Sequence, residues 1–219
     1  MEIVPIEFFG VAIEVVFPAP LGFHQSGIDE FAAKLCDPAK GLGLRPQQIR
    51  LRRTDDLYDY ELTGQFFGEN GVVSRGPDRA KISVRNARNG ADWNLIHQTI
   101  SRFYTQMEFP ETSVTSLSCH VHAKFPSIDD RDGYLSQFSH NFGILRPACL
   151  GYVQIMDWEK EIRVLIEQSN VVQNALFVCW DTQFSNRQDE WESFLSAIPT
   201  VMENSVNVFG LGLEPLAHP

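Results

Sequence analysis

A cysteine and two histidines lie within four residues of one another in the segment SLSCHVHAKF, residues 116–125. These residue types bind metal ions and act as nucleophiles and bases. The alternation of polar and apolar residues predicts a strand, in which successive side chains point to opposite faces. Cys119 then lies on the face opposite to His120 and His122, so this strand alone cannot bring all three side chains to one metal ion.

His120 and His122 share a face, and this makes them the weak candidates for a metal site. No spacing in the sequence selects a third ligand for them, and the comparable strand of residues 12–17 contains no histidine. We therefore expect no metal or other cofactor, and interpret the pair as the solvated face of a strand. A metal-dependent hydrolase that uses this HxH pair remains an alternative.

No other segment carries a recognisable catalytic motif. The sequence has no GxSxG nucleophile elbow, and its two GLGL segments, 41–44 and 210–213, lack the lysine and hydroxyl of a phosphate loop. None of the four cysteines lies at CxxC spacing from another. We name no catalytic residue, leave open whether the chain is an enzyme, and favour a non-enzymatic protein.

Composition and charge narrow the classes of partner. The chain has 219 residues and a net charge of −10, which opposes binding to nucleic acids and anionic lipids. Basic residues cluster at 45–53 and 75–88, but acidic residues interrupt both runs, so we interpret them as solvated strand faces. No apolar run is long enough for a membrane span. We expect a cytoplasmic protein that binds neither nucleic acid nor membrane.

The elements that would position any site occur twice. The shared elements, first half then second, are a strand ending in Phe-Pro (12–20 and 120–128), a short amphipathic helix (27–37 and 129–138), a Leu-Arg-Pro segment (44–46 and 145–147), an acidic hairpin, a further strand (81–86 and 175–184) and a helix opening on Trp93 or Trp191. This series predicts an α+β fold of two tandem, pseudo-symmetric β-α-β-β-β-α units, with largely antiparallel sheets backed by helices. The predicted halves are residues 1–112 and 113–219.

Two local patterns add detail to this prediction. Asn70-Gly71 lies between apolar pairs, which is typical of a hairpin turn whose central residues have positive φ. Pro199 lies within the last helical pattern, where it removes a backbone donor, so we expect a kink or a break there.

Residues 75–107 contain a Gly-Pro turn, a strand, a polar link and a helix that opens on tryptophan and ends in an aromatic residue. This run resembles part of a widespread family of uncharacterised bacterial proteins. The resemblance implies two halves that are each similar to the export-chaperone (SecB-like) fold. It implies no catalytic residue.

The sequence therefore favours a protein that acts by protein–protein contact, as an interaction or scaffold protein. We expect a protein partner or self-association, and a homodimer is plausible. A chaperone-like peptide-binding module is a further alternative, and it requires an exposed apolar groove. Phe66, Phe67 and Trp158, which lie near predicted hairpins, are the candidate binding residues, although a place in the core would also suit them.

Overall fold

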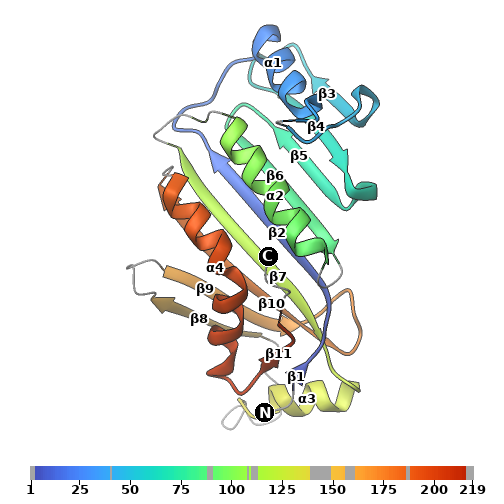
Figure 1. Cartoon of the computed structure of the whole chain (residues 1–219). Helices are drawn as coiled ribbons and strands as arrows, with labels where there is room; N and C mark the ends of the chain where they lie inside the picture. The colour runs from blue at the N-terminus through green and yellow to red at the C-terminus, as the bar shows by residue number, and fades with distance from the viewer. Residues whose placement is uncertain are drawn as a thin grey trace.

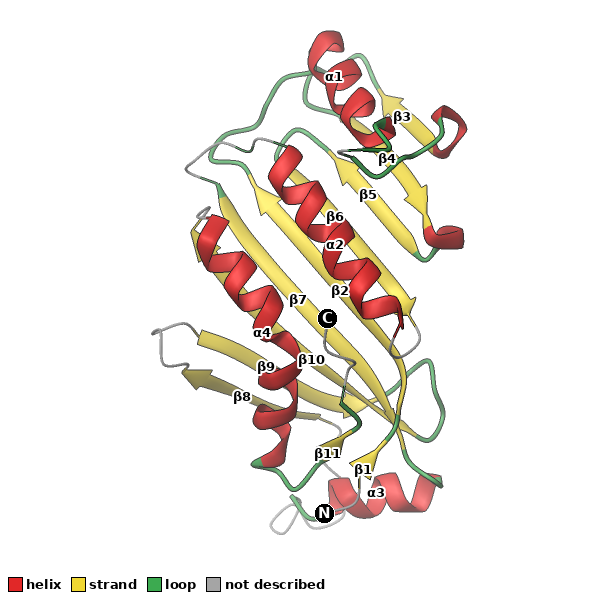
Figure 2. Ribbon diagram, in the orientation of Figure 1, coloured by secondary structure: helices red, strands yellow, loops and turns green. Residues whose placement is uncertain are grey.

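The computed structural model describes residues 3–39, 41–87, 91–107, 109, 113–138, 149–155, 161–185 and 188–215. These residues form a nine-stranded sheet in which all neighbouring strands are antiparallel, a two-stranded parallel sheet, and four α-helices (Figures 1 and 2). The predicted α+β class and the largely antiparallel sheet are confirmed. None of the helices in these ranges combines the length and apolarity needed to cross a bilayer.

The elements run along the chain as β1 (Ile3–Val4), β2 (Ile6–Val16), α1 (Gln25–Cys36), β3 (Ile49–Arg53), β4 (Tyr60–Phe66), β5 (Gly71–Arg75), β6 (Arg79–Ala87), α2 (Ala91–Gln106), β7 (Val114–Lys124), α3 (Ile128–Ser136), β8 (Cys149–Ile155), β9 (Glu161–Gln168), β10 (Ala175–Ser185), α4 (Gln188–Asn207) and β11 (Gly212–Leu213). Short 3-10 helices, η1 (Pro46–Gln48) and η2 (Phe67–Glu69), precede β3 and follow β4.

The large sheet contains strands from both halves of the chain. Its strand order is β3-β4-β5-β6-β2-β7-β10-β9-β8, so the first strands of the two halves, β2 and β7, pair at its centre. The second half has the predicted β-α-β-β-β-α order, and the first half has one strand more. The division into halves at residue 112 and the duplication itself stay predictions.

Helices cover one face of this sheet. Figures 1 and 2 show α2 and α4 side by side across its central strands, with α1 over β3, β4 and β5. The predicted apolar stripe of α2 is buried at Trp93, Ile96, Ile100, Phe103 and Met107, as are Phe194, Leu195 and Ile198 of α4. These side chains pack against alternate residues of the strands in one core, because alternate strand residues point to the same face.

The ends of the sheet are closed differently. At one end Arg75 lies over the ring of Phe31 in α1, 5.0 Å from its centroid. At the other end α3 packs through Tyr134 against Phe125, with ring centroids 5.9 Å apart. The parallel pair β1–β11 lies next to α3 (Figure 2).

The hairpin predicted at Asn70-Gly71 is present, but the prediction that these two residues have positive φ angles is wrong. β4 and β5 pair as a hairpin, and the positive φ angles fall on Phe67 (48°) and Gly68 (61°), whereas Asn70 has a right-handed φ of −74°. Phe66 is buried at the end of β4, and the chain turns immediately after it. Packing of Phe66 therefore fixes the turn earlier than the local Asn-Gly preference would.

Of the kink or break expected at Pro199, the break is absent, since α4 continues through the proline from Gln188 to Asn207. The kink stays a prediction. The side chains on both sides of the proline, Ile198 and Val201, are buried against the sheet. Their burial stabilises the helical path by more than the lost hydrogen bond destabilises it. The helix ends close to Gly210, whose φ of 72° is the left-handed value that glycine favours after a helix.

We predict that Ser205→Ala destabilises the contact between α4 and β10. The hydroxyl of Ser205 accepts a hydrogen bond from the buried indole N–H of Trp180 at 2.5 Å. Alanine leaves this donor without its acceptor, at a cost of about 1–3 kcal/mol in the free energy of unfolding. Urea denaturation would measure the loss. Thr200→Ala at an exposed position of the same helix is the control; equal effects of the two changes would contradict the prediction.

Candidate functional site

The histidine pair lies where the sequence placed it, on the face of the sheet opposite to the helices. Cys119 is buried on the core face, whereas the rings of His120 and His122 lie 5.8 Å apart on the other face. The predicted separation of the cysteine from the histidines is therefore confirmed. The predicted solvation is wrong for His122, which is 4 % exposed, because Phe8 of β2 and Phe177 of β10 lie against its ring.

His122 has a defined hydrogen-bond partner. Its Nδ1 lies 2.8 Å from the hydroxyl of Ser169, and that hydroxyl accepts hydrogen bonds from the backbone N–H groups of Val171 and Val172. Because both acceptor positions of Ser169 are occupied, its own proton is donated to His122. The ring of His122 is then neutral with its proton on Nε2, and Ser169 stabilises a turn instead of serving as a nucleophile.

His120 lies directly over the backbone of β2. A Cβ atom at Gly10 would come within 2.4 Å of Cε1 of His120 and within 2.8 Å of the carbonyl oxygen of Val84. The pairing of β2 with β6 is irregular at this glycine, between Phe9 and Val11, and the pairing of β2 with β7 is irregular just before it, between Ile6 and Phe8. Bulges re-aim side chains within a sheet, and here the glycine gives the imidazole its space.

Burial controls the protonation of this cluster. It lowers the pKa of His120 to about 4, with further lowering by His122 and Arg85, and it lowers the pKa of His122. Burial also raises the pKa of the neighbouring Cys179 thiol to about 11. The cluster therefore carries neutral imidazoles and a neutral thiol at pH 7, and Cys179 has no thiolate with which to attack a substrate.

The described part of the chain gives the histidine pair no further ligands with which to form a metal site. Two imidazoles provide two ligands, whereas zinc sites use three or four protein ligands. Within the described ranges, no group of three or more histidine, cysteine, aspartate or glutamate residues could hold a metal ion. The metal-dependent hydrolase alternative gains no support from these residues.

The aromatic binding candidates separate into three cases. Phe66 is 7 % exposed and belongs to the core, as its alternative interpretation proposed. Phe67 is 37 % exposed, and its ring lies edge-on to that of Phe66 with centroids 4.8 Å apart. Trp158 lies outside the described residues. Only Phe67 is therefore placed by the structure at an accessible position.

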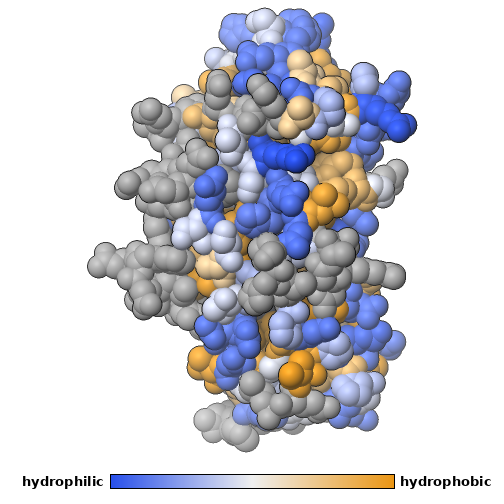
Figure 3. All heavy atoms as spheres, in the orientation of Figure 1, coloured by the Kyte–Doolittle hydropathy of each residue, from blue (hydrophilic) through white to orange (hydrophobic). Residues whose placement is uncertain are grey.

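Phe67 forms part of an apolar groove between the β4–β5 turn and α2. Two adjoining cavities of about 310 and 290 Å³ both contain Phe67 and Leu95 in their walls. Figure 3 shows a hydrophobic patch, surrounded by hydrophilic surface, on this face of the molecule. We call this feature the Phe67 groove; its apolar walls are Leu42, Leu44, Phe66, Val84, Ala87 and Ile96.

Two further properties distinguish the Phe67 groove. Arg102 is the charged residue that α2 contributes to its described walls, and no described carboxylate lines it. Arg85 also borders the groove, but its charge lies close to His120 on the other face of the sheet. Phe67 and Asn86, which both line it, have positive φ angles of 48° and 52°. Such conformations cost free energy in residues other than glycine and often occur at functional sites. The groove thus combines apolar walls, positive charge and two strained positions.

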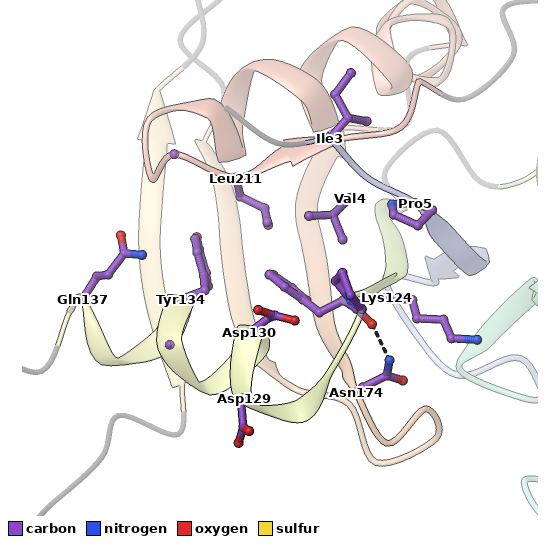
Figure 4. A pocket seen from close by; sticks show the side chains of 14 residues that line it. Ile3, Val4, Pro5, Lys124, Asp129, Asp130, Tyr134, Gln137, Asn174 and Leu211 are labelled. Atoms are coloured by element: carbon purple, nitrogen blue, oxygen red, sulfur yellow. Dashed lines mark hydrogen bonds between the residues drawn. The ribbon is translucent and has the colours of Figure 1, made fainter.

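A third cavity, of about 730 Å³, lies between α3 and β1. In Figure 4, Val4 and Leu211 point into it, Asp129 points away, and the side-chain amide of Asn174 donates to the carbonyl of Phe125. Asp130 accepts a hydrogen bond from Ser127 at 2.6 Å, which caps α3. Asp130, Asn174 and Lys124 of this cavity are thus engaged by Ser127, Phe125 and Glu7. We select the Phe67 groove as the candidate site for its apolar walls.

Sequence reasoning missed Leu95, which is 48 % exposed beside Phe67. The signal was present, because Leu95 lies off the apolar stripe of α2 and an exposed leucine on a polar helix face can indicate a contact surface. It also missed Gly10 and Ser169, which shape the histidine cluster through contacts between distant segments.

No protein family and no curated protein matches the chain. The resemblance to the family with export-chaperone-like halves therefore stays a prediction.

We predict that Gly10→Ala destabilises the fold, because the new methyl group would overlap both the ring of His120 and the backbone of β6. Overpacking of this kind costs about 1–3 kcal/mol in the free energy of unfolding. Gly27→Ala in α1, where a Cβ meets nothing within 4 Å, is the matched control and should be neutral or stabilising. Denaturant midpoints of the two variants that shift equally would contradict this account.

We further predict that His120 weakens the fold in acid. The unfolded chain binds a proton here below the ordinary pKa of 6.5, whereas the folded chain does so only near 4, so stability is complete above 6.5 and falls as pH decreases between these values. The loss is at most about 3 kcal/mol. Urea titrations across this window should show a smaller loss for His120→Gln. His24→Gln, at an exposed histidine, is the control and should retain the wild-type slope.

Proposed function

We propose that this chain is a non-enzymatic protein-interaction protein that binds an apolar segment of a partner protein in the Phe67 groove. The observation that supports the proposal is the groove itself, because its walls are mostly apolar and the charged residue on its α2 side is Arg102, in a chain of net charge −10. Local positive charge within an acidic protein favours a partner with acidic residues. The expected ligand is an apolar side chain flanked by Asp or Glu.

The size of the groove fits this kind of ligand. Its cavities, of about 310 and 290 Å³, lie at the low end of the range for small-ligand sites. One or two large side chains would fill them, and Phe67 and Leu95 would contact both. This arrangement agrees with a peptide-binding module more closely than with an enzyme, since Cys179 and His120 lie on the opposite face of the sheet, where burial leaves both uncharged.

We predict that random peptides displayed on phage and selected on the purified full chain share a large apolar residue next to Asp or Glu. A synthetic peptide of the enriched sequence should bind the wild-type protein, and Leu95→Glu should weaken its binding about tenfold or more, because the change places a carboxylate in the groove. Isothermal titration calorimetry would measure the dissociation constants. Phe67→Ala should weaken binding by loss of the contact surface.

The control is Leu57→Glu, which adds the same charge at a leucine that is 60 % exposed and outside the groove. It should bind the selected peptide as the wild type does. Arg102→Glu should weaken binding and reduce its dependence on salt, since that dependence arises from the attraction between arginine and acidic residues. Peptides that bind Leu95→Glu and wild type equally would overturn the proposal.

A further inference from the structure

The face of the sheet opposite to the helices is a second, separate surface. All the described helices that lie over the large sheet cover the other face (Figure 2). The exposed face carries the residues that alternate with the core, and its centre is the seam between β2 and β7. Such a large uncovered sheet face indicates an interaction surface, and its pattern of side chains specifies the partner.

Apolar residues lie at both ends of the seam. Val16 and Val114 pair across it at one end and are both exposed. Phe8 and Phe177 lie beside the neutral histidines towards the other end. Between them Ala12, Ser83, Ser118 and Cys179 have small side chains, whereas the ring of His120 covers Gly10 and Glu14 forms an ion pair with Arg79. A second sheet could therefore approach most closely at the row that contains Ala12 and Ser118.

Charges lie on the two sides of the seam with opposite sign. Ion pairs within the chain engage Arg52 and Arg79. On the side of β6, Lys81 and Arg85 form no ion pair with another described residue, whereas Arg50 of β3 and Glu61 of β4 lie outside the four central strands. On the side of β9 and β10, the residues that form no ion pair with another described residue are three acidic ones, Asp181, Glu161 and Glu167, and one basic one, Arg163.

We propose that this face binds a second copy of the chain, with a twofold axis that runs parallel to β2 and β7 between the two sheets. Such an axis places β6 of one copy over β10 of the other, so the basic side meets the acidic side. It also places the valine end of each seam against the valine end of the other. In this arrangement the uncovered faces of the two copies are complementary to each other in both apolar residues and charge.

The registers of the strands fix the expected contact. Ser83, Ala12, Ser118 and Asp181 form one row across four strands. The proposed axis keeps each row opposite itself, so Asp181 of one copy lies over Ser83 of the other. Lys81 and Arg85 lie one pleat on either side of Ser83 and reach the carboxylate from both directions.

The area is sufficient for a stable dimer. The four central strands span about 36 Å along β2 and about 19 Å across the sheet, from a rise of ~3.3 Å per residue and a strand spacing of ~4.8 Å. This footprint of roughly 700 Å² per copy is close to the ~800 Å² per partner of standard interfaces.

Multi-angle light scattering on the full chain tests the proposal. The wild type should have twice the chain mass of 24.8 kDa at micromolar concentration. Lys81→Glu and Asp181→Lys should each raise the dissociation constant of the dimer about tenfold or more, because each brings like charges together at two places. Arg50→Glu, on the edge strand β3 outside the footprint, is the control and should leave the dimer intact.

The decisive measurement is an equimolar mixture of Lys81→Glu and Asp181→Lys. Across the twofold axis each heterodimer has one reversed pair of opposite charges and one native pair, so the mixture should dimerise as the wild type does. Misfolding of a variant cannot produce this rescue. A wild type that stays monomeric throughout the micromolar range, or a mixture no more dimeric than its components, would overturn the proposal.

Discussion

The pairing of β2 with β7 is the interaction on which the rest of the structure depends. Their ladder runs from Ile6 opposite Ala123 to Val16 opposite Val114 and joins the halves into one sheet. It places α2 beside α4, where His97 and Ser196 come within 3.4 Å. Because side chains alternate in a strand, this one register decides which residues enter the core and which form the seam. A shift by one residue would exchange the two faces.

Local patterns in the sequence predict most of the elements, because they depend on neighbouring residues. The alternation around Phe17-Pro18 and Phe125-Pro126 predicts β2 and β7, and the stripe that begins at Trp93 predicts the buried face of α2. The strand order could not be predicted, since pairing between residues so distant in sequence leaves no local periodicity. The two predicted halves could meet in several ways, and in the structure β2 and β7 pair edge to edge.

The same distinction explains which site residues were predicted. Alternation alone places His120 and His122 on one face, but the burial of His122 depends on Phe8 and Phe177 from neighbouring strands. Phe67 was predicted because aromatic residues near a hairpin are conspicuous. Its left-handed backbone was not, because the sequence assigned positive φ to the Asn-Gly pair while the burial of Phe66 moved the turn.

The two proposed surfaces lie on opposite sides of the sheet, and this arrangement has a consequence for binding. The Phe67 groove opens beside α2 on the helix-covered face, whereas the seam lies on the uncovered face. A dimer formed through the seam would leave both grooves accessible and directed away from each other. A partner with two acidic-apolar segments on a linker long enough to span the dimer would bind with a raised effective concentration at the second groove. The weak affinity expected of one small groove would then suffice for stable binding, and dimerisation would control partner binding without any change in the groove.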